Sequence, residues 1–70
     1  MIYRTVLNMD GSHANLIERL SDNAFIPFDP ANTDYANFKK QINADEAQLE
    51  DADGNLMTAE QAKAFVATLP

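Results

Sequence analysis

The chain has 70 residues, no cysteine, and a formal net charge of −6 at pH 7. A chain of this length forms one small domain with a limited core, and without cysteine it has neither disulfides nor thiolate metal ligands. The acidic charge repels phosphate groups, so we expect neither nucleic acid nor an anionic membrane among its partners. We also expect no targeting segment and no membrane-spanning segment, because its apolar runs are short.

The first third of the chain has the pattern of a β-sheet. Residues 2–8 are rich in β-branched and aromatic residues, with apolar side chains on both alternating faces, and predict a strand. An Asp-Gly turn signal follows, and the extended mixture over residues 15–20 completes a predicted hairpin. Residues 24–28 predict a short third strand, which must lie at an edge or an end because Pro27 has no N–H to donate.

A helix is predicted after the second proline of this region. Asn32 or Thr33 can cap its N-terminus. Spacings of three and four residues place one apolar stripe toward the hairpin, made of Tyr35, Phe38 and Ile42. Acidic residues stand at the next positions of the stripe, so the helix ends or bends between residues 43 and 47.

A second helix is predicted near the end of the sequence. Thr58-Ala-Glu-Gln61 has the spacing of a capping box, and the apolar stripe behind it consists of Ala59, Ala62, Phe65, Val66 and Leu69. An Asp-Gly pair at residues 53–54 predicts a tiny hairpin or an ordered loop between the two helices. The predicted fold class is α+β: a small single domain over residues 1–70, with an N-terminal β-hairpin or three-stranded meander packed against two amphipathic helices.

The Asp-rich segment after residue 49 partly imitates the loop of a calcium-binding EF-hand. Asp51, Asp53 and Glu60 fall on ligand positions when Leu49 is taken as the first position of the loop. That first position normally carries an Asp, which Leu49 cannot replace. We therefore predict no metal site, and interpret the segment as an Asp-Gly turn leading into a capped helix.

No residue pattern indicates catalysis. His13 lies beside Asp10 and Ser12, but side chains this close in sequence do not converge as nucleophile, base and orienting acid. No second His or Cys is present to complete a zinc site. The acidic side chains between residues 45 and 53 would need an enclosing pocket to work as acid and base. We expect no enzymatic activity and no cofactor.

The aromatic residues between positions 25 and 38 have two interpretations. They are core residues, or part of the group remains on the surface and marks a protein interface. The sheet edge beside Pro27 is the expected contact, so the candidate interface residues are Phe25, Pro27, Phe28 and Tyr35. A chain this small gains stability by burying such residues against a partner or a second copy.

The segment Ile26-Pro-Phe-Asp-Pro-Ala-Asn-Thr-Asp-Tyr35, followed by Phe38, resembles a motif of small phage-encoded proteins and of tail-fibre or tail-assembly-associated modules. Lys39 and Lys40 stand where many such modules have a Leu and a Trp. The resemblance implies a phage setting, in which this segment is a folding and docking element and carries no catalytic residues. The first function that fits this setting is a structural or assembly module that acts in the virion through contacts with itself or with tail components. The alternative is a small acidic effector that binds a host protein in the host cytoplasm.

Overall fold

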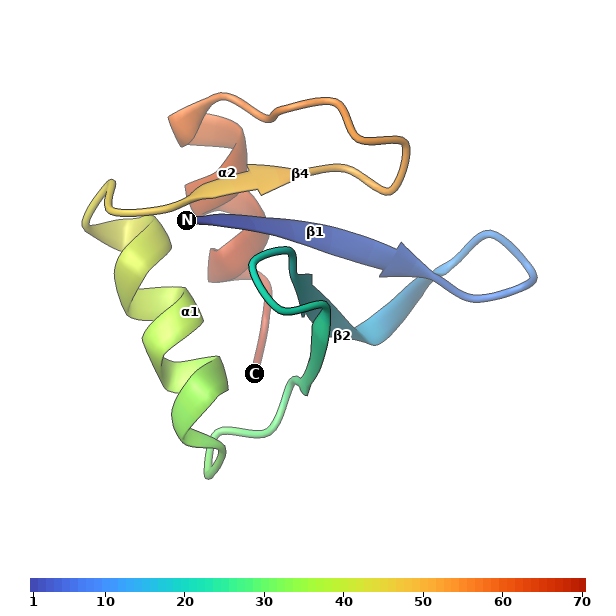
Figure 1. The fold of residues 1–70 in the computed structure, drawn as a ribbon, viewed down its shortest axis with the longest axis horizontal. Coiled ribbons are helices and arrows are strands. Elements are labelled where there is room, and N and C mark those ends of the chain that lie inside the picture. Colours follow the sequence, from blue (N-terminus) through green and yellow to red (C-terminus); the bar gives the residue numbers. More distant parts are fainter.

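The computed structural model describes residues 1–70, which form a four-stranded mixed sheet and two helices (Figure 1). The strands are β1 (Ile2–Leu7), β2 (His13–Arg19), β3 (Ala24–Pro27) and β4 (Gln48–Glu50), and the helices are α1 (Thr33–Asn43) and α2 (Ala59–Ala67). The predicted α+β class is confirmed. No helix is long and apolar enough to cross a membrane.

The sheet has the strand order β3-β2-β1-β4. β2 is antiparallel to both β1 and β3, which is the predicted meander, and Pro27 lies on an edge strand as expected. The tiny hairpin predicted around residues 53–54 is present, with Glu50 of β4 paired to Leu56, but the addition of β4 to the sheet was not predicted. β4 pairs in parallel with β1, where Tyr3 lies opposite Leu49, and the short hairpin after β4 brings Leu56 back beside Glu50.

The core lies between one face of the sheet and the two helices. α1 and α2 lie side by side, with α2 behind β1 and β4 in the view of Figure 1. Alternate residues of the strands point toward the helices, so the strands and the helices contribute to one buried cluster made of Tyr3, Ile17, Ile26, Tyr35, Phe38, Ile42, Leu49, Ala62 and Val66.

Both helices begin at the caps that the sequence predicted. The Asn32 side chain accepts a hydrogen bond from the Tyr35 N–H, and Thr58 and Gln61 form a complete capping box. α1 ends at Asn43, within the predicted interval. Its end is closed by Asp45, whose N–H donates to the Ile42 carbonyl and whose φ of 59° lies in the left-handed region that normally favours glycine.

Candidate functional site

The four residues predicted at an interface, three aromatic residues and one proline, divide into an exposed pair and a pair that packs in or against the core. Phe25 is 61% exposed and Pro27 is exposed. Tyr35 is 1% exposed, because it belongs to the inner stripe of α1. Phe28 is half-buried, with its ring 5.4 Å from that of Tyr35. The structure therefore removes Tyr35 from the candidate interface, assigns Phe28 largely to packing, and leaves Phe25 and Pro27 accessible.

The side of the sheet opposite the core carries no helix. Strand residues that alternate with the core residues point to this side, and the pairing of the strands aligns them in rows. One row crosses the molecule in the order Phe25, Glu18, Arg4, Glu50 and Leu56. Beside it lie four apolar residues: Ile2 and Val6 on β1, Leu16 on β2, and Pro27 on β3. We call the surface formed by this row and these four residues the open face.

Two large apolar side chains stand at the two ends of the row. Phe25 is 61% exposed and Leu56 is 55% exposed. Ile2, Val6 and Leu16 are half-buried, because neighbouring side chains of the same face shield one another. An apolar sheet face is normally covered by another layer of structure, so this uncovered face is a candidate contact surface.

Arg4 lies at the centre of the open face between two carboxylates. Its Nε donates to Glu50 Oε1 at 2.9 Å, and its Nη2 lies 2.8 Å from the same oxygen. The Glu50 side chain is only 13% exposed, whereas the Arg4 side chain is 38% exposed, so the carboxylate is the shielded partner of this ion pair. Glu18 lies opposite Arg4 on β2, yet it forms no ion pair. The Glu18 carboxylate is thus free, in the middle of an apolar face.

Neither edge of the sheet offers a continuous row of backbone groups to another strand. At the β3 edge, Pro27 has no N–H, and its carbonyl accepts a hydrogen bond from the Asp29 N–H at 2.9 Å. At the β4 edge, the Met57 N–H donates to the Leu49 carbonyl at 2.8 Å. Binding at the sheet therefore depends on the side chains of the open face and not on strand addition.

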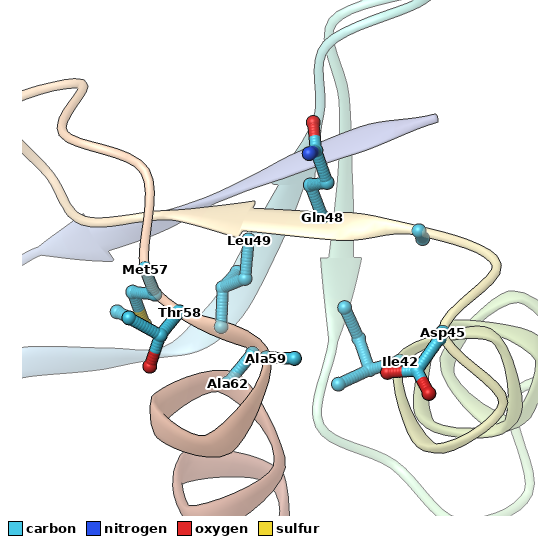
Figure 2. Close-up of a pocket in the computed structure, with 9 residues that line it drawn as sticks. Ile42, Asp45, Gln48, Leu49, Met57, Thr58, Ala59 and Ala62 are labelled. Carbon is cyan, nitrogen blue, oxygen red and sulfur yellow. The ribbon is translucent and has the colours of Figure 1, made fainter.

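A shallow hollow of about 190 Å³ lies between the end of α1, β4 and the start of α2 (Figure 2). Ile42, Leu49 and Ala62 are at most 4% exposed, so little apolar surface is available to a ligand there. Asp45, at the side of the hollow, pairs with Lys63 at 3.0 Å. Figure 2 also shows Gln48 pointing away from the hollow, to the opposite side of β4. The open face exposes more apolar side chain than this hollow does.

The acidic residues of the EF-hand-like segment are not gathered around a common point. No group of three or more His, Cys, Asp or Glu side chains is placed to hold a metal ion. The Asp51 carboxylate instead accepts hydrogen bonds from the N–H groups of Asp53 and Asn55, at 2.9 Å each. Hydrogen bonds from the Asn55 backbone, above all, hold the pKa of Asp51 below its usual range. Asp51 thus closes its own turn, as the Asp-Gly interpretation expected, while Asp53 is exposed and Glu60 lies in the first turn of α2.

His13 does not form part of a catalytic arrangement. Its ring packs against Phe65 of α2, with ring centroids 5.7 Å apart. Asp10 and Ser12 bond to each other in the turn before β2, at 2.6 Å between the Ser12 hydroxyl and Asp10 Oδ1. The His13 ring therefore does not converge with Asp10 and Ser12.

Comparison of the chain with protein-family models, with curated proteins and with solved structures found no match in any of the three. Function is therefore inferred from the geometry of the chain itself.

Of the residues on the open face, the sequence predicted Phe25 and Pro27 as contact residues, but it did not predict Glu18, Leu16 or Leu56. The sequence did contain one signal for a second apolar face. In the first strand Ile2 and Val6 lie on the face opposite to that of Tyr3 and are apolar as well.

Proposed function

We propose that this chain is a small, non-catalytic protein-interaction module that acts through its open face, as a structural or assembly-associated component of a phage particle. The observation that carries the proposal is the uncovered apolar side of the sheet, with Phe25 and Leu56 exposed at its two ends. Exposed apolar side chains that gather on one face mark contact surfaces for other proteins, and Phe25 and Leu56 share this face with the half-buried Ile2, Val6 and Leu16.

The phage setting is supported by the resemblance of the segment from Ile26 to Tyr35 to phage tail modules. In the structure this segment runs from the edge strand β3 into α1, and Asn32 caps the helix. The segment thus holds β3, with Phe25 and Pro27, against the rest of the domain. Its role in this proposal is to build the contact surface, and no catalytic residue is carried over.

Mass spectrometry of purified virions of the phage that encodes the chain tests this proposal. A constant copy number per particle is the expected result for a structural component. Absence from purified particles would contradict it and would favour the alternative, an acidic effector that binds a host protein. The net charge of −6 does not separate the two functions, because it steers the chain toward basic surfaces in either case.

Self-association is one of the two ways of covering the apolar surface that the sequence predicted, and it is tested separately. Light scattering coupled to size exclusion at several protein concentrations measures it, and Phe25→Asp is the variant to compare. Met9→Asp is the matched control. Met9 is fully exposed in the turn after β1, and its replacement introduces the same charge as Phe25→Asp. A concentration-dependent dimer that is lost only in Phe25→Asp supports self-assembly, whereas a monomer at every concentration counts against it.

A further inference from the structure

We propose that the open face binds one amphipathic helix of a different protein, and that a Lys or Arg of this helix pairs with Glu18. The inference rests on the proposed function, since it names the chemistry of the partner that covers the same face. Four observations carry it: the free carboxylate, the balance of charge around it, the blocked sheet edges, and the size of the face.

The free carboxylate determines what a partner must supply. Glu18 stands between Phe25 on β3 and Arg4 on β1, and Arg4 is already bonded to Glu50 at 2.9 Å. A partner that covers the face removes water from Glu18, and a carboxylate that loses its water without gaining a cation is strongly unfavourable. An apolar partner surface alone therefore does not suffice. The partner brings a Lys or an Arg to this point.

A second copy of the chain meets this requirement poorly. Two open faces packed together would enclose four carboxylates, Glu18 and Glu50 from each copy, against two Arg4 side chains. Each copy also carries a net charge of −6, so the two chains repel each other over longer distances. The charges favour a basic partner of a different sequence over a dimer built on this face.

The blocked edges of the sheet determine which secondary structure the bound segment of the partner adopts. Pro27 at one edge and the Leu49–Met57 hydrogen bond at the other leave no row of backbone groups to pair with an added strand. A segment lying flat on the face must satisfy its own N–H and C=O groups, because the side chains beneath it are largely apolar. An α-helix does so internally, and a helix on the second side of a sheet is a common layer arrangement.

The size of the face matches a single helix. The row from Phe25 to Leu56 crosses four strand spacings, or about 19 Å, and the distance along β1 from Ile2 to Val6 is about 13 Å. A helix of about 13 residues is about 19 Å long and about 10 Å wide. The outline of the face is thus about 250 Å², well below the roughly 800 Å² that each partner buries in a standard interface between folded domains.

Selection from a library identifies the partner chemistry directly. Surface-displayed peptides of about 14 residues, patterned as helices and randomised on the apolar stripe and its flanks, are selected against the full chain. Salt is held at about 150 mM, where long-range attraction to the acidic chain is largely screened. The expected consensus has apolar residues at spacings of three and four with a Lys or Arg among them. Chemical-shift changes in the bound chain should fall on the outward residues of β1, β2 and β3.

Glu18→Gln is the decisive variant, and Glu60→Gln is its matched control. Both remove one negative charge, but Glu60 lies exposed in the first turn of α2, away from the open face. Loss of one charge-assisted hydrogen bond predicts a roughly tenfold weaker affinity for Glu18→Gln, and a change below about twofold for Glu60→Gln. Equal losses in the two variants would show unspecific attraction and would overturn the inference.

Other outcomes separate this inference from the proposed function. Selected peptides without a shared cation, or with shift changes on the helices, would overturn the pairing with Glu18. A failed selection together with a dimer that Phe25→Asp disrupts would make a second copy the occupant, which overturns the inference but retains the open face as the interaction surface. A failed selection with no dimer and no incorporation into particles would overturn both.

Discussion

The ring of Phe38 on α1 meets the ring of Tyr3 on β1 edge-on, with ring centroids 4.8 Å apart and ring planes at 67°. Phe38 is fully buried and Tyr3 is 1% exposed. The Tyr3 hydroxyl also donates to Gln41 Oε1 at 2.7 Å, and burial raises the pKa of this phenol, which keeps the donating proton in place. The pair fixes α1 across a central strand of the sheet.

Phe38→Ala should lower the free energy of unfolding by about 3 to 5 kcal/mol, since it removes a buried ring and leaves a cavity. A domain of this size has little stability to spare, so the variant should be largely unfolded at room temperature. Urea or thermal unfolding followed by circular dichroism measures the change. Phe25→Ala is the matched control, because Phe25 is 61% exposed, and it should change stability by less than about 0.5 kcal/mol. A folded Phe38→Ala variant with an unchanged midpoint would contradict this account of the core.

Thr5 should be replaceable by valine with a gain in stability. Thr5 is 2% exposed, and its Oγ1 has no hydrogen-bond partner. Thr5→Val keeps the shape of the side chain and removes the unsatisfied hydroxyl, which should raise the free energy of unfolding by about 1 kcal/mol. Thr33→Val, at an exposed position in the first turn of α1, serves as the control and should be nearly neutral. A lower melting temperature for Thr5→Val than for the parent chain would show that the hydroxyl is satisfied in solution.

Acid should destabilise the chain partly through Asp51. Its pKa is lower in the folded chain than in the unfolded chain, where it has the ordinary value of about 3.9. The unfolded state therefore takes up the proton first, so the stabilisation is present above that value and is lost as pH falls through the lower, folded pKa. Hydrogen bonds from Ser12 and Arg19 lower the pKa values of Asp10 and Asp22 in the same direction.

Unfolding midpoints measured between about pH 6 and pH 3 cover this window. Asp51→Asn should weaken the dependence of stability on pH. Asp53→Asn, a neighbouring carboxylate whose side chain is exposed and closes no turn, should leave the dependence unchanged. Identical pH dependences in the parent chain and in Asp51→Asn would disprove the role given to these hydrogen bonds.

The left-handed backbone at Asp45 predicts a difference between two substitutions. Asp45 has a φ of 59° and pairs with Lys63 at 3.0 Å. Asp45→Gly and Asp45→Ala lose the same ion pair, so the difference between them reports on the backbone alone. Because a Cβ in this region costs about 1 kcal/mol, Asp45→Gly should be more stable than Asp45→Ala by about that amount. Equal melting temperatures would mean that the end of α1 relaxes to another conformation.

Local patterns predicted most of the fold. The capping residues Asn32 and Thr58 and the apolar stripes of the two helices were readable because each depends on neighbours within one or two turns. The Asp-Gly pair indicated the small hairpin that contains β4, but the pairing of β4 with β1 was not readable, since β4 has three residues and β1 lies far back in the chain. A strand this short shows no alternation of its own, and only the fold brings Leu49 beside Tyr3.

The candidate site was predictable to a smaller extent. Pro27 predicted an edge strand, and from this prediction Phe25 was expected near a contact surface. The open face itself depends on strand register, which aligns Phe25 with Glu18 and Glu18 with Arg4. Register is a long-range property that the hydrophobic pattern fixes only once the pairing is known. Glu18 has no ion-pair partner, because Arg4 beside it pairs with Glu50 instead. No sequence pattern indicated which of the two carboxylates Arg4 would bind.

The order of the strands has a consequence for synthesis. β1 leaves the ribosome before the other strands of this sheet, yet it lies between β2 and β4 in the finished sheet. Its ion-pair partner Glu50 follows Arg4 by 46 residues, a delay of roughly 2 to 9 s at usual rates of translation. During this interval the nascent chain exposes one unpaired side of β1 and the apolar ring of Tyr3. Until β4 has emerged, this side of β1 is accessible to chaperones and to neighbouring nascent copies.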